Sequence, residues 1–305
     1  MSRCLRAAIV LLLALLAAAP VAGAPSGFAF LEVPAGARAS ALGGAFATLG
    51  EGVEASFWNP AGLAAVEGVQ ITGAHVESFQ HLRHDQFAVA RRWLGGGVSA
   101  SLRAFYSEPI VARDELGNET GTFGGHDLAF GLAYGRALAA GLRVGASARL
   151  IRERIAELSS GTYALGAGAT WQSPDRSALR LGLMVDNIGP DANFTFADGP
   201  GQPVPLPMAL QGGANYRWGP AGAAQLGASL ETRVTRGRAG VAILGGELTH
   251  PSGAALRLGL RVNDDASRLS AGAGYTMASL RLDYAFVADR LDLGDSHRVS
   301  FTASF

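Results

Sequence analysis

The stretch LRLGLRV, residues 256–262, alternates strictly between apolar and other side chains. Leucine and valine occupy the even positions, and two arginines and a glycine occupy the odd positions. Because successive side chains of a β-strand point to opposite faces, this pattern predicts a strand with one apolar and one polar face. Residues 142–150 (LRVGASARL) and 269–277 (LSAGAGYTM) repeat the pattern.

The alternation continues from residue 67 to the end of the chain and predicts about fourteen strands. An even number fits a bacterial single-chain barrel, and ~9–11 residues suit a tilted strand that crosses a bilayer. The expected strands are 69–79, 84–93, 96–107, 126–136, 141–154, 160–172, 179–188, 207–217, 222–233, 238–249, 253–263, 267–277, 279–287 and 297–305.

Such strands could form either a soluble sandwich or a membrane barrel. A barrel would turn the apolar face toward lipid and keep the arginines on its inner wall, where they meet water or acidic partners. A sandwich could expose the same arginines to solvent. The mid-strand arginines on the polar face are Arg103, Arg143, Arg149, Arg180, Arg217, Arg257, Arg261 and Arg281.

The lengths of the connections favour the barrel. The long ones, 108–125, 187–206 and 288–296, are the third, seventh and thirteenth in order, whereas even-numbered ones such as 94–95 and 250–252 are short. Outer-membrane barrels place short turns at the periplasmic end and longer loops outside. The sequence therefore predicts an all-β fold, a transmembrane antiparallel barrel of about fourteen strands over residues 67–305.

The composition agrees with a membrane barrel and excludes a basic nucleic-acid-binding protein. Of 305 residues, 16% are charged and 49% are hydrophobic, and the formal net charge is zero. The 42 glycines are about twice the usual share and follow no collagen period.

Residues 1–23 have the pattern of a cleaved signal peptide. Arg3 and Arg6 precede an apolar run that is shorter than the ~20 residues of a membrane-spanning helix, and a small-residue patch ends at Gly23. The single cysteine, Cys4, lies in this segment, so the processed chain would have no thiol. We therefore expect export to the outer membrane of a Gram-negative cell.

Residues 24–66 are expected to form a small, partly helical plug inside the barrel. Ser40 is a candidate N-cap for a helix with Leu42, Phe46 and Leu49 on one face, and Asn59-Pro60 is a second helix start. A fourteen-stranded barrel is wide enough to need filling. A periplasmic cap on the barrel is the alternative.

The plug region carries a resemblance to a known family. The string from Ala37-Arg38-Ala39 through Leu42-Gly43-Gly44-Ala45-Phe46 to Trp58-Asn59-Pro60-Ala61-Gly62-Leu63 resembles the opening of the PorV/PorQ family of outer-membrane barrels, which are related to FadL-type transporters. Further matches are residues 185–189 (VDNIG), followed by Leu206-Pro207, residues 212–216 (GGANY) and 283–286 (DYAF), and residues 293–300 (LGDSHRVS).

The resemblance implies a fourteen-stranded barrel with an N-terminal plug, and its FadL-type relatives favour passage of hydrophobic small molecules across the outer membrane. The alternative that it implies is an accessory or shuttle component of a type IX-like secretion system, which binds secreted proteins at the cell surface. The residues that we assign to plugging and gating are Gly43, Gly44, Phe46, Trp58, Asn59, Pro60 and Ala61.

No enzymatic, metal or cofactor chemistry is expected. The densest histidine cluster, His81 and His84, is expected in a solvated turn, and no Gly-x-Ser-x-Gly motif occurs. The expected partners are outer-membrane lipids, a hydrophobic small molecule or secreted protein, and the barrel assembly machinery. The last would read the alternating C-terminal strand that ends in Phe305.

Overall fold

The computed structural model describes residues 26–78, 82–139, 141–173, 178–196, 199–220, 222–289 and 294–305. The predicted signal peptide, residues 1–23, lies outside the described residues.

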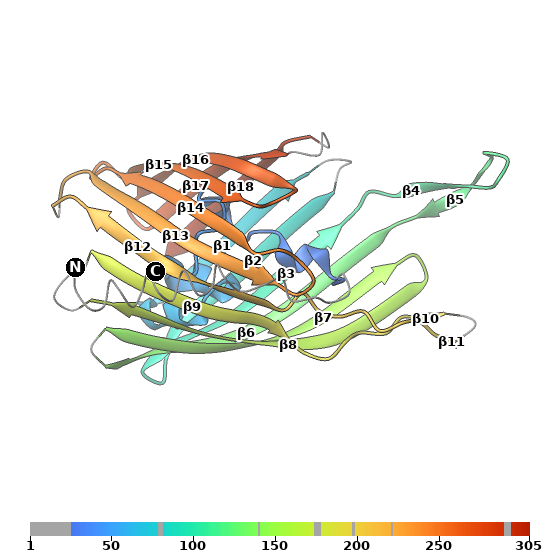
Figure 1. Ribbon diagram of the computed structural model, residues 1–305, viewed down its shortest axis with the longest axis horizontal. Coiled ribbons are helices and arrows are strands. Elements are labelled where there is room, and N and C mark those ends of the chain that lie inside the picture. The colour runs from blue at the N-terminus through green and yellow to red at the C-terminus, as the bar shows by residue number, and fades with distance from the viewer. Residues whose placement is uncertain are drawn as a thin grey trace.

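The chain forms a closed barrel of fourteen antiparallel strands (Figure 1). Each strand pairs with its neighbours in the chain, and the last strand pairs with the first, from Gln70 opposite Ser304 to Glu77 opposite His297. The fold class predicted from the sequence is confirmed. The barrel strands are β1 (Val69–Glu77), β2 (Arg83–Trp93), β3 (Gly96–Tyr106), β6 (Gly125–Ala139), β7 (Leu142–Ile155), β8 (Leu158–Gln172), β9 (Leu179–Ile188), β12 (Ala209–Trp218), β13 (Gln225–Thr235), β14 (Val241–Thr249), β15 (Ala254–Val262), β16 (Ser267–Met277), β17 (Leu280–Asp289) and β18 (Ser296–Ser304).

The barrel is apolar outside and polar inside. In β15, Leu256 and Leu258 are 61% and 68% exposed, whereas Arg257 between them is 4% exposed. A soluble sandwich would bury the leucines and expose the arginine, so these fractions decide between the two architectures. Of the eight arginines that the alternation placed on the polar face, only Arg217, at the end of β12, is exposed.

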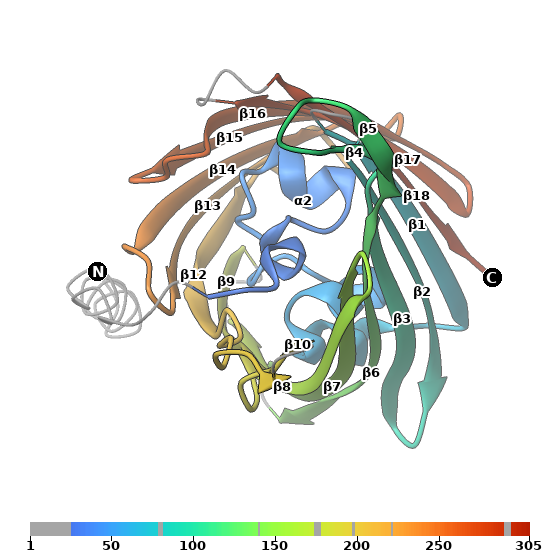
Figure 2. The same ribbon diagram turned by 90° about the vertical axis from the view of Figure 1, so that its right-hand side faces the viewer.

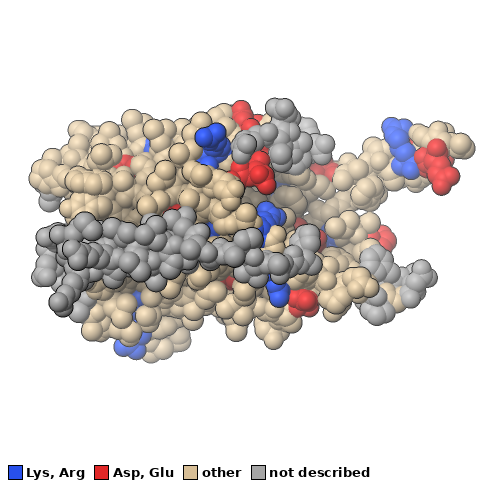
Figure 3. All heavy atoms as spheres, viewed as in Figure 1, with Lys and Arg blue, Asp and Glu red and all other residues tan. Residues whose placement is uncertain are grey.

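The long connections all leave the barrel at one end, which we call the loop end. Two of them carry hairpins that the sequence did not predict: β4 (Ile110–Arg113) with β5 (Glu119–Phe123), and β10 (Thr195–Phe196) with β11 (Gly199–Pro200). The first hairpin projects well beyond the barrel (Figure 1), and its tip carries charges while the wall in the same view is mostly uncharged (Figure 3). Short turns close the other end, the turn end.

Residues 26–66, which we call the inner segment, lie within the barrel (Figure 2). They form the short helices η1 (Ala29–Glu32), α2 (Ala37–Ala41), η2 (Gly52–Phe57) and η3 (Pro60–Ala65). Helix α2 packs on β15 to β18, and η3 packs on β3 and β6 to β8. No helix in the described part of the chain is long and apolar enough to cross a membrane.

The sequence predicted a helix that begins at Ser40, and this predicted start is wrong. Helix α2 begins after Gly36, and Ser40 lies inside it, with its hydroxyl donating to the Gly36 carbonyl at 2.7 Å. The chain turns sharply after Leu42 because Gly43 and Gly44 adopt positive φ angles. Phe46 is nevertheless completely buried, because turns and not a helix direct it inward.

Candidate functional site: the inner segment and its cavity

Asn59 joins the inner segment to the barrel wall. Its side-chain amide donates to the carbonyl of Ala47 at 2.9 Å and to the wall carbonyls of Ala169 and Leu183 at 3.1 and 3.2 Å. Its side-chain oxygen accepts from the N–H of Ala61 at 3.2 Å and so caps η3, with Pro60 in the first turn. The predicted cap is confirmed, and the same side chain also binds two wall strands.

Gly43 and Gly44 end α2 and bring the backbone to the wall. Their φ angles are 67° and 87°, in the region that favours glycine. The Gly44 N–H donates to the Ala39 carbonyl at 2.9 Å, which closes the helix end. Arg261 and Gln211 on the wall donate to the carbonyls of Gly43 and Gly44 at 2.9 and 2.8 Å.

Phe46 and Trp58 form the aromatic centre of the inner segment. Their rings meet edge to face with centroids 5.7 Å apart, and Arg38 lies 5.5 Å from the Phe46 ring. The indole N–H of Trp58 donates to the Ala35 carbonyl at 3.1 Å. The structure thus brings the sequence-assigned residues into one buried unit, since the side chains of Phe46 and Trp58 are in contact and Asn59 follows directly.

Four glycines form a continuous row across the inner wall. Gly97, Gly135, Gly145 and Gly168 stand opposite one another in register on β3, β6, β7 and β8. A Cβ atom on any of them would overlap η3 or its Asn59 cap. The row lets the backbone of η3 lie directly on the wall, so the glycines fix where this helix docks.

A closed ring of six alternating charges holds the other half of the inner segment. Arg38 and Glu54 come from the inner segment, and the other four charges come from β14, β15 and β17. Five of the six contacts are 2.5–2.9 Å long, and the Arg38–Glu54 contact is 3.6 Å. We call this set the ionic ring: Arg38, Glu247, Arg257, Asp283, Arg281 and Glu54.

The ionic ring satisfies charges that would otherwise be costly to bury. Burial alone would lower the pKa of Arg38, but the carboxylates of Glu247 and Glu54 outweigh it and raise that pKa above its usual value. Arg38 therefore stays charged, and the ring has no net charge.

Two more carboxylates attach the inner segment. Glu51 binds Arg143 at 2.5 Å and Arg180 at 3.2 Å on the wall. Burial favours a raised pKa for Glu51, but the attraction of Arg180 and the hydrogen bond from Arg143 hold its pKa below the usual value. Glu231, fully buried on β13, accepts from the N–H groups of Ala47 and Thr48 at 3.1 and 3.0 Å.

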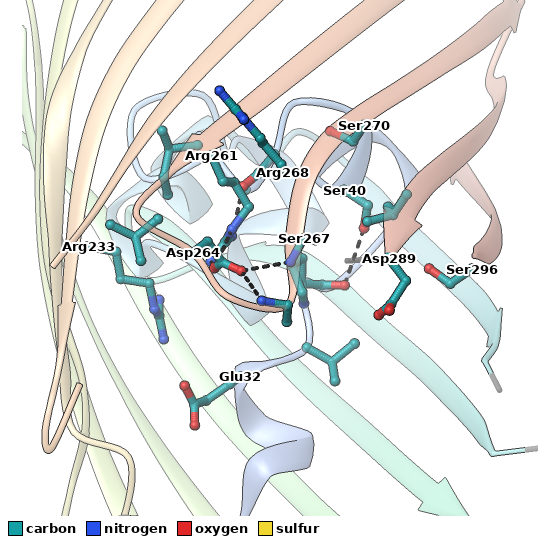
Figure 4. A pocket seen from close by; sticks show the side chains of 18 of the residues that line it. Glu32, Ser40, Arg233, Arg261, Asp264, Ser267, Arg268, Ser270, Asp289 and Ser296 are labelled. Atoms are coloured by element: carbon teal, nitrogen blue, oxygen red, sulfur yellow. Dashed lines mark hydrogen bonds and ion pairs between the residues drawn. The ribbon is translucent and has the colours of Figure 1, made fainter. Parts of the chain in front are cut away.

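A cavity of about 340 Å³ lies at the loop end between the inner segment and the wall formed by β12 to β18 (Figure 4). Gly43, Gly44 and Trp58 line it on the side of the inner segment. Burial raises the pKa of Glu32 in this cavity, an effect that Arg238, 3.0 Å away, partly offsets. The cavity is thus polar at its rim and backed by the aromatic centre.

The barrel wall is interrupted at β9. Strand β8 pairs with β9 only as far as Leu165 opposite Ile188, although β8 begins at Leu158. Asn187 adopts a φ of 58° and turns the chain away, and its side chain donates to the Pro207 carbonyl at 3.1 Å. Arg149 holds this turn through Asp186 at 2.7 Å.

The segment after β9 fills the interruption and meets the start of the inner segment. Phe28, Phe30 and Leu31 pack with Ala192 and Leu206 in one buried cluster. Residues 185–189 and Leu206-Pro207, which are part of the family resemblance seen in the sequence, therefore shape the wall where the inner segment begins.

Several residues of the site were not found from the sequence. Arg38, Glu51 and Glu54 attach the inner segment, and His84 is buried on β2 rather than solvated in a turn. His81 lies outside the described residues. Within the described residues, no group of three or more His, Cys, Asp or Glu side chains could hold a metal ion.

Comparisons with known proteins identify the fold. The model of an uncharacterised protein family, UPF0164, matches residues 20–156. A search of the curated proteins finds no match. The PorV/PorQ resemblance stays a prediction.

The similar solved structures include two toluene transporters and a FadL homologue. The Pseudomonas putida toluene transporter TodX is 14% identical, with a TM-score of 0.63 over 94% of this chain and 100% of that one. The Ralstonia pickettii toluene transporter TbuX is 13% identical, with a TM-score of 0.59 over 88% and 98%. A Pseudomonas aeruginosa FadL homologue is 12% identical, with a TM-score of 0.51 over 88% and 98%. The chain thus has a closed fourteen-stranded barrel similar to those of FadL-type channels.

Proposed function

We propose that this protein lies in the outer membrane and passes hydrophobic small molecules, with the inner segment as its plug. The observation that carries the proposal is the inner segment itself, which occupies the barrel and is bound to opposite sides of the wall by Asn59 and by the ionic ring. The apolar outer wall supports the location in a membrane. The likeness to channels described as toluene and monoaromatic hydrocarbon transporters supports the class of cargo.

A route for the cargo follows from the geometry. A molecule would enter the cavity at the loop end and meet Trp58 at its base. Beside β9, the first part of β8 is not paired with β9. A small shift of residues 26–31, which pack at this interruption, would therefore open a path toward the membrane. We assign this as the exit.

The two halves of the plug are held differently, and this decides which half moves. The half at η3 rests on the glycine row, where the backbone of Pro60 and Leu63 and the side chain of Asn59 lie directly on the wall. The half at α2 and residues 42–46 also lies close to two wall glycines, Gly259 and Gly272. Its polar attachments, the ionic ring and Arg261, come from long side chains, which can exchange for water in a wet lumen. We therefore propose that Asn59-Pro60 is the fixed point and that the α2 half moves.

A reversible cross-link tests this mechanism. The Cβ of Ala45 lies 3.2 Å from the position that a Cβ on Gly245 of β14 would take, close to the ~3.5–4.5 Å of a disulfide. With Cys4 replaced by Ser, the pair Ala45→Cys and Gly245→Cys should form a disulfide that stops toluene entry into cells lacking their own channels of this kind. Reduction should restore entry, and each single variant serves as the control. Full entry through the oxidised double variant would contradict movement of the α2 half.

A further inference from the structure

The cavity at the loop end has an excess of positive charge. Five arginines line it, against Glu32, Asp264 and Asp289. Two of the three acids are already bound to arginines, Glu32 to Arg238 at 3.0 Å and Asp264 to Arg261 at 2.7 Å. The arginines that line the cavity are Arg233, Arg238, Arg261, Arg268 and Arg298.

Arg233 is the cation best placed to receive a ligand. It extends into the cavity from β13 (Figure 4), and its one hydrogen bond among the described residues goes from Nη1 to the side-chain oxygen of Gln211 at 3.0 Å. No carboxylate of the described residues lies within ion-pair distance of it. A guanidinium has five N–H donors in a planar fork that fits a carboxylate, so most of its binding capacity is unused.

Part of the remaining lining is apolar, and the cavity is small. Trp58, Val241 and Ile243 contribute apolar side chains to the lining. The volume of about 340 Å³ lies at the small end of the ~300–1,000 Å³ found for ligand pockets. Such a space suits one ring or a short branched body with a single charged group.

We infer that this cavity selects a compact organic acid, a molecule with a ring-sized apolar body and one carboxylate, over a neutral hydrocarbon of the same shape. The carboxylate would lie against Arg233 and the apolar body against Trp58 and Ile243. A neutral ligand would cover the Arg233 guanidinium and strip its water without replacing the lost hydrogen bonds, which disfavours it. The inference rests on the proposed function and names its substrate class.

Benzoate and toluene are the matched probes, because they share a ring and differ in the carboxylate. Binding to the detergent-solubilised protein can be followed by tryptophan fluorescence, since Trp58 lines the cavity, and Trp58→Phe should remove the signal. We expect benzoate to bind at least ~10-fold more tightly than toluene. Arg233→Gln should weaken benzoate binding about 10-fold or more without weakening toluene binding, because the lost interaction is a charge-assisted one that only benzoate makes.

Two variants control the measurement. Arg233→Lys should keep most of the affinity because it keeps the charge, and Arg217→Gln, at the turn end and outside the cavity, should change neither affinity. Migration of unheated samples in SDS confirms that each variant is a folded barrel. Equal binding of the two probes, or benzoate affinity unchanged in Arg233→Gln, overturns the inference.

Uptake separates this inference from the proposed function. If cells take up toluene through the protein while benzoate shows no preference or Arg233 dependence, the passage of hydrophobic molecules stands and the selection of acids fails. If neither probe binds or enters, both fail.

Discussion

Asn59 docks the inner segment on two strands of the barrel wall. Its one amide group serves three carbonyls, two of which belong to β8 and β9, and its oxygen caps η3. A buried amide that loses these partners leaves polar groups unsatisfied, and each such group is costly. The side chain therefore combines a local role, which a sequence motif can indicate, with a long-range role, which only the folded barrel shows.

Replacement of Asn59 by Ala should lower the free energy of unfolding by about 1–3 kcal/mol, because the donors to Ala169 and Leu183 and the cap on Ala61 are lost together. Urea unfolding in detergent followed by tryptophan fluorescence measures the change. The matched control is Asn118→Ala in the exposed loop between β4 and β5, where we expect little effect. Equal stabilities of the two variants would contradict the role of Asn59.

At the residue scale, the sequence predicted the cap but not the charged attachments. Asn-Pro is a local signal, so Asn59 and Pro60 could be assigned. Arg38, Glu51 and Glu54 have partners more than ninety residues away in the chain, and no local pattern shows such a pairing. One signal was present: inner-wall arginines need acidic partners, and residues 24–66 contain only three acids, Glu32, Glu51 and Glu54.

At the scale of elements, the inner segment is held by the glycine row and Glu51 on one side and by the ionic ring on the other. The high glycine content was visible in the sequence, and the alternation placed Gly145 on the polar face. That four glycines align across β3, β6, β7 and β8 depends on strand register, which the alternation alone does not give. The row explains part of the glycine excess as a docking surface.

The row predicts a position-dependent response to added methyl groups. Gly145→Ala would place a Cβ against Pro60, and we expect a loss of about 1–3 kcal/mol in unfolding free energy from overpacking. Gly246→Ala on β14 meets no atom within 4 Å and should change stability by no more than ~0.5 kcal/mol. Thermal unfolding of both variants tests the contrast, and equal melting temperatures would refute a docking role for the row.

The Glu51 attachment predicts a dependence on pH. Because Arg180 and Arg143 hold the pKa of Glu51 below its usual value of 4.5, the charged carboxylate stabilises the folded state above that pH. The contribution is lost as the pH falls below 4.5 through the lowered pKa. Melting temperatures of the native chain and of Glu51→Gln should therefore differ at pH 7 and converge as the pH falls through the lowered pKa of Glu51. A difference that is constant over this range would argue against the ion pair.

At the scale of the whole molecule, the alternation determined most of the barrel. The ranges predicted for β9 and β16 coincide with the observed strands, and β13 begins three residues later than expected because the turn at Gly219 and Gly222 extends further. The β4–β5 and β10–β11 hairpins were missed because they pair only with each other and not with the barrel. The pairing of β1 with β18, which closes the barrel, agrees with the predicted barrel of about fourteen strands.

The central claim is that the inner segment closes the bore of a membrane barrel. Single-channel recording in planar bilayers tests it most directly, on the native chain and on a variant lacking residues 26–66. The variant must first show heat-dependent migration in SDS, which establishes a folded barrel. We predict a low conductance for the native chain and large, stable openings for the variant. The same low conductance from the folded variant would contradict the account.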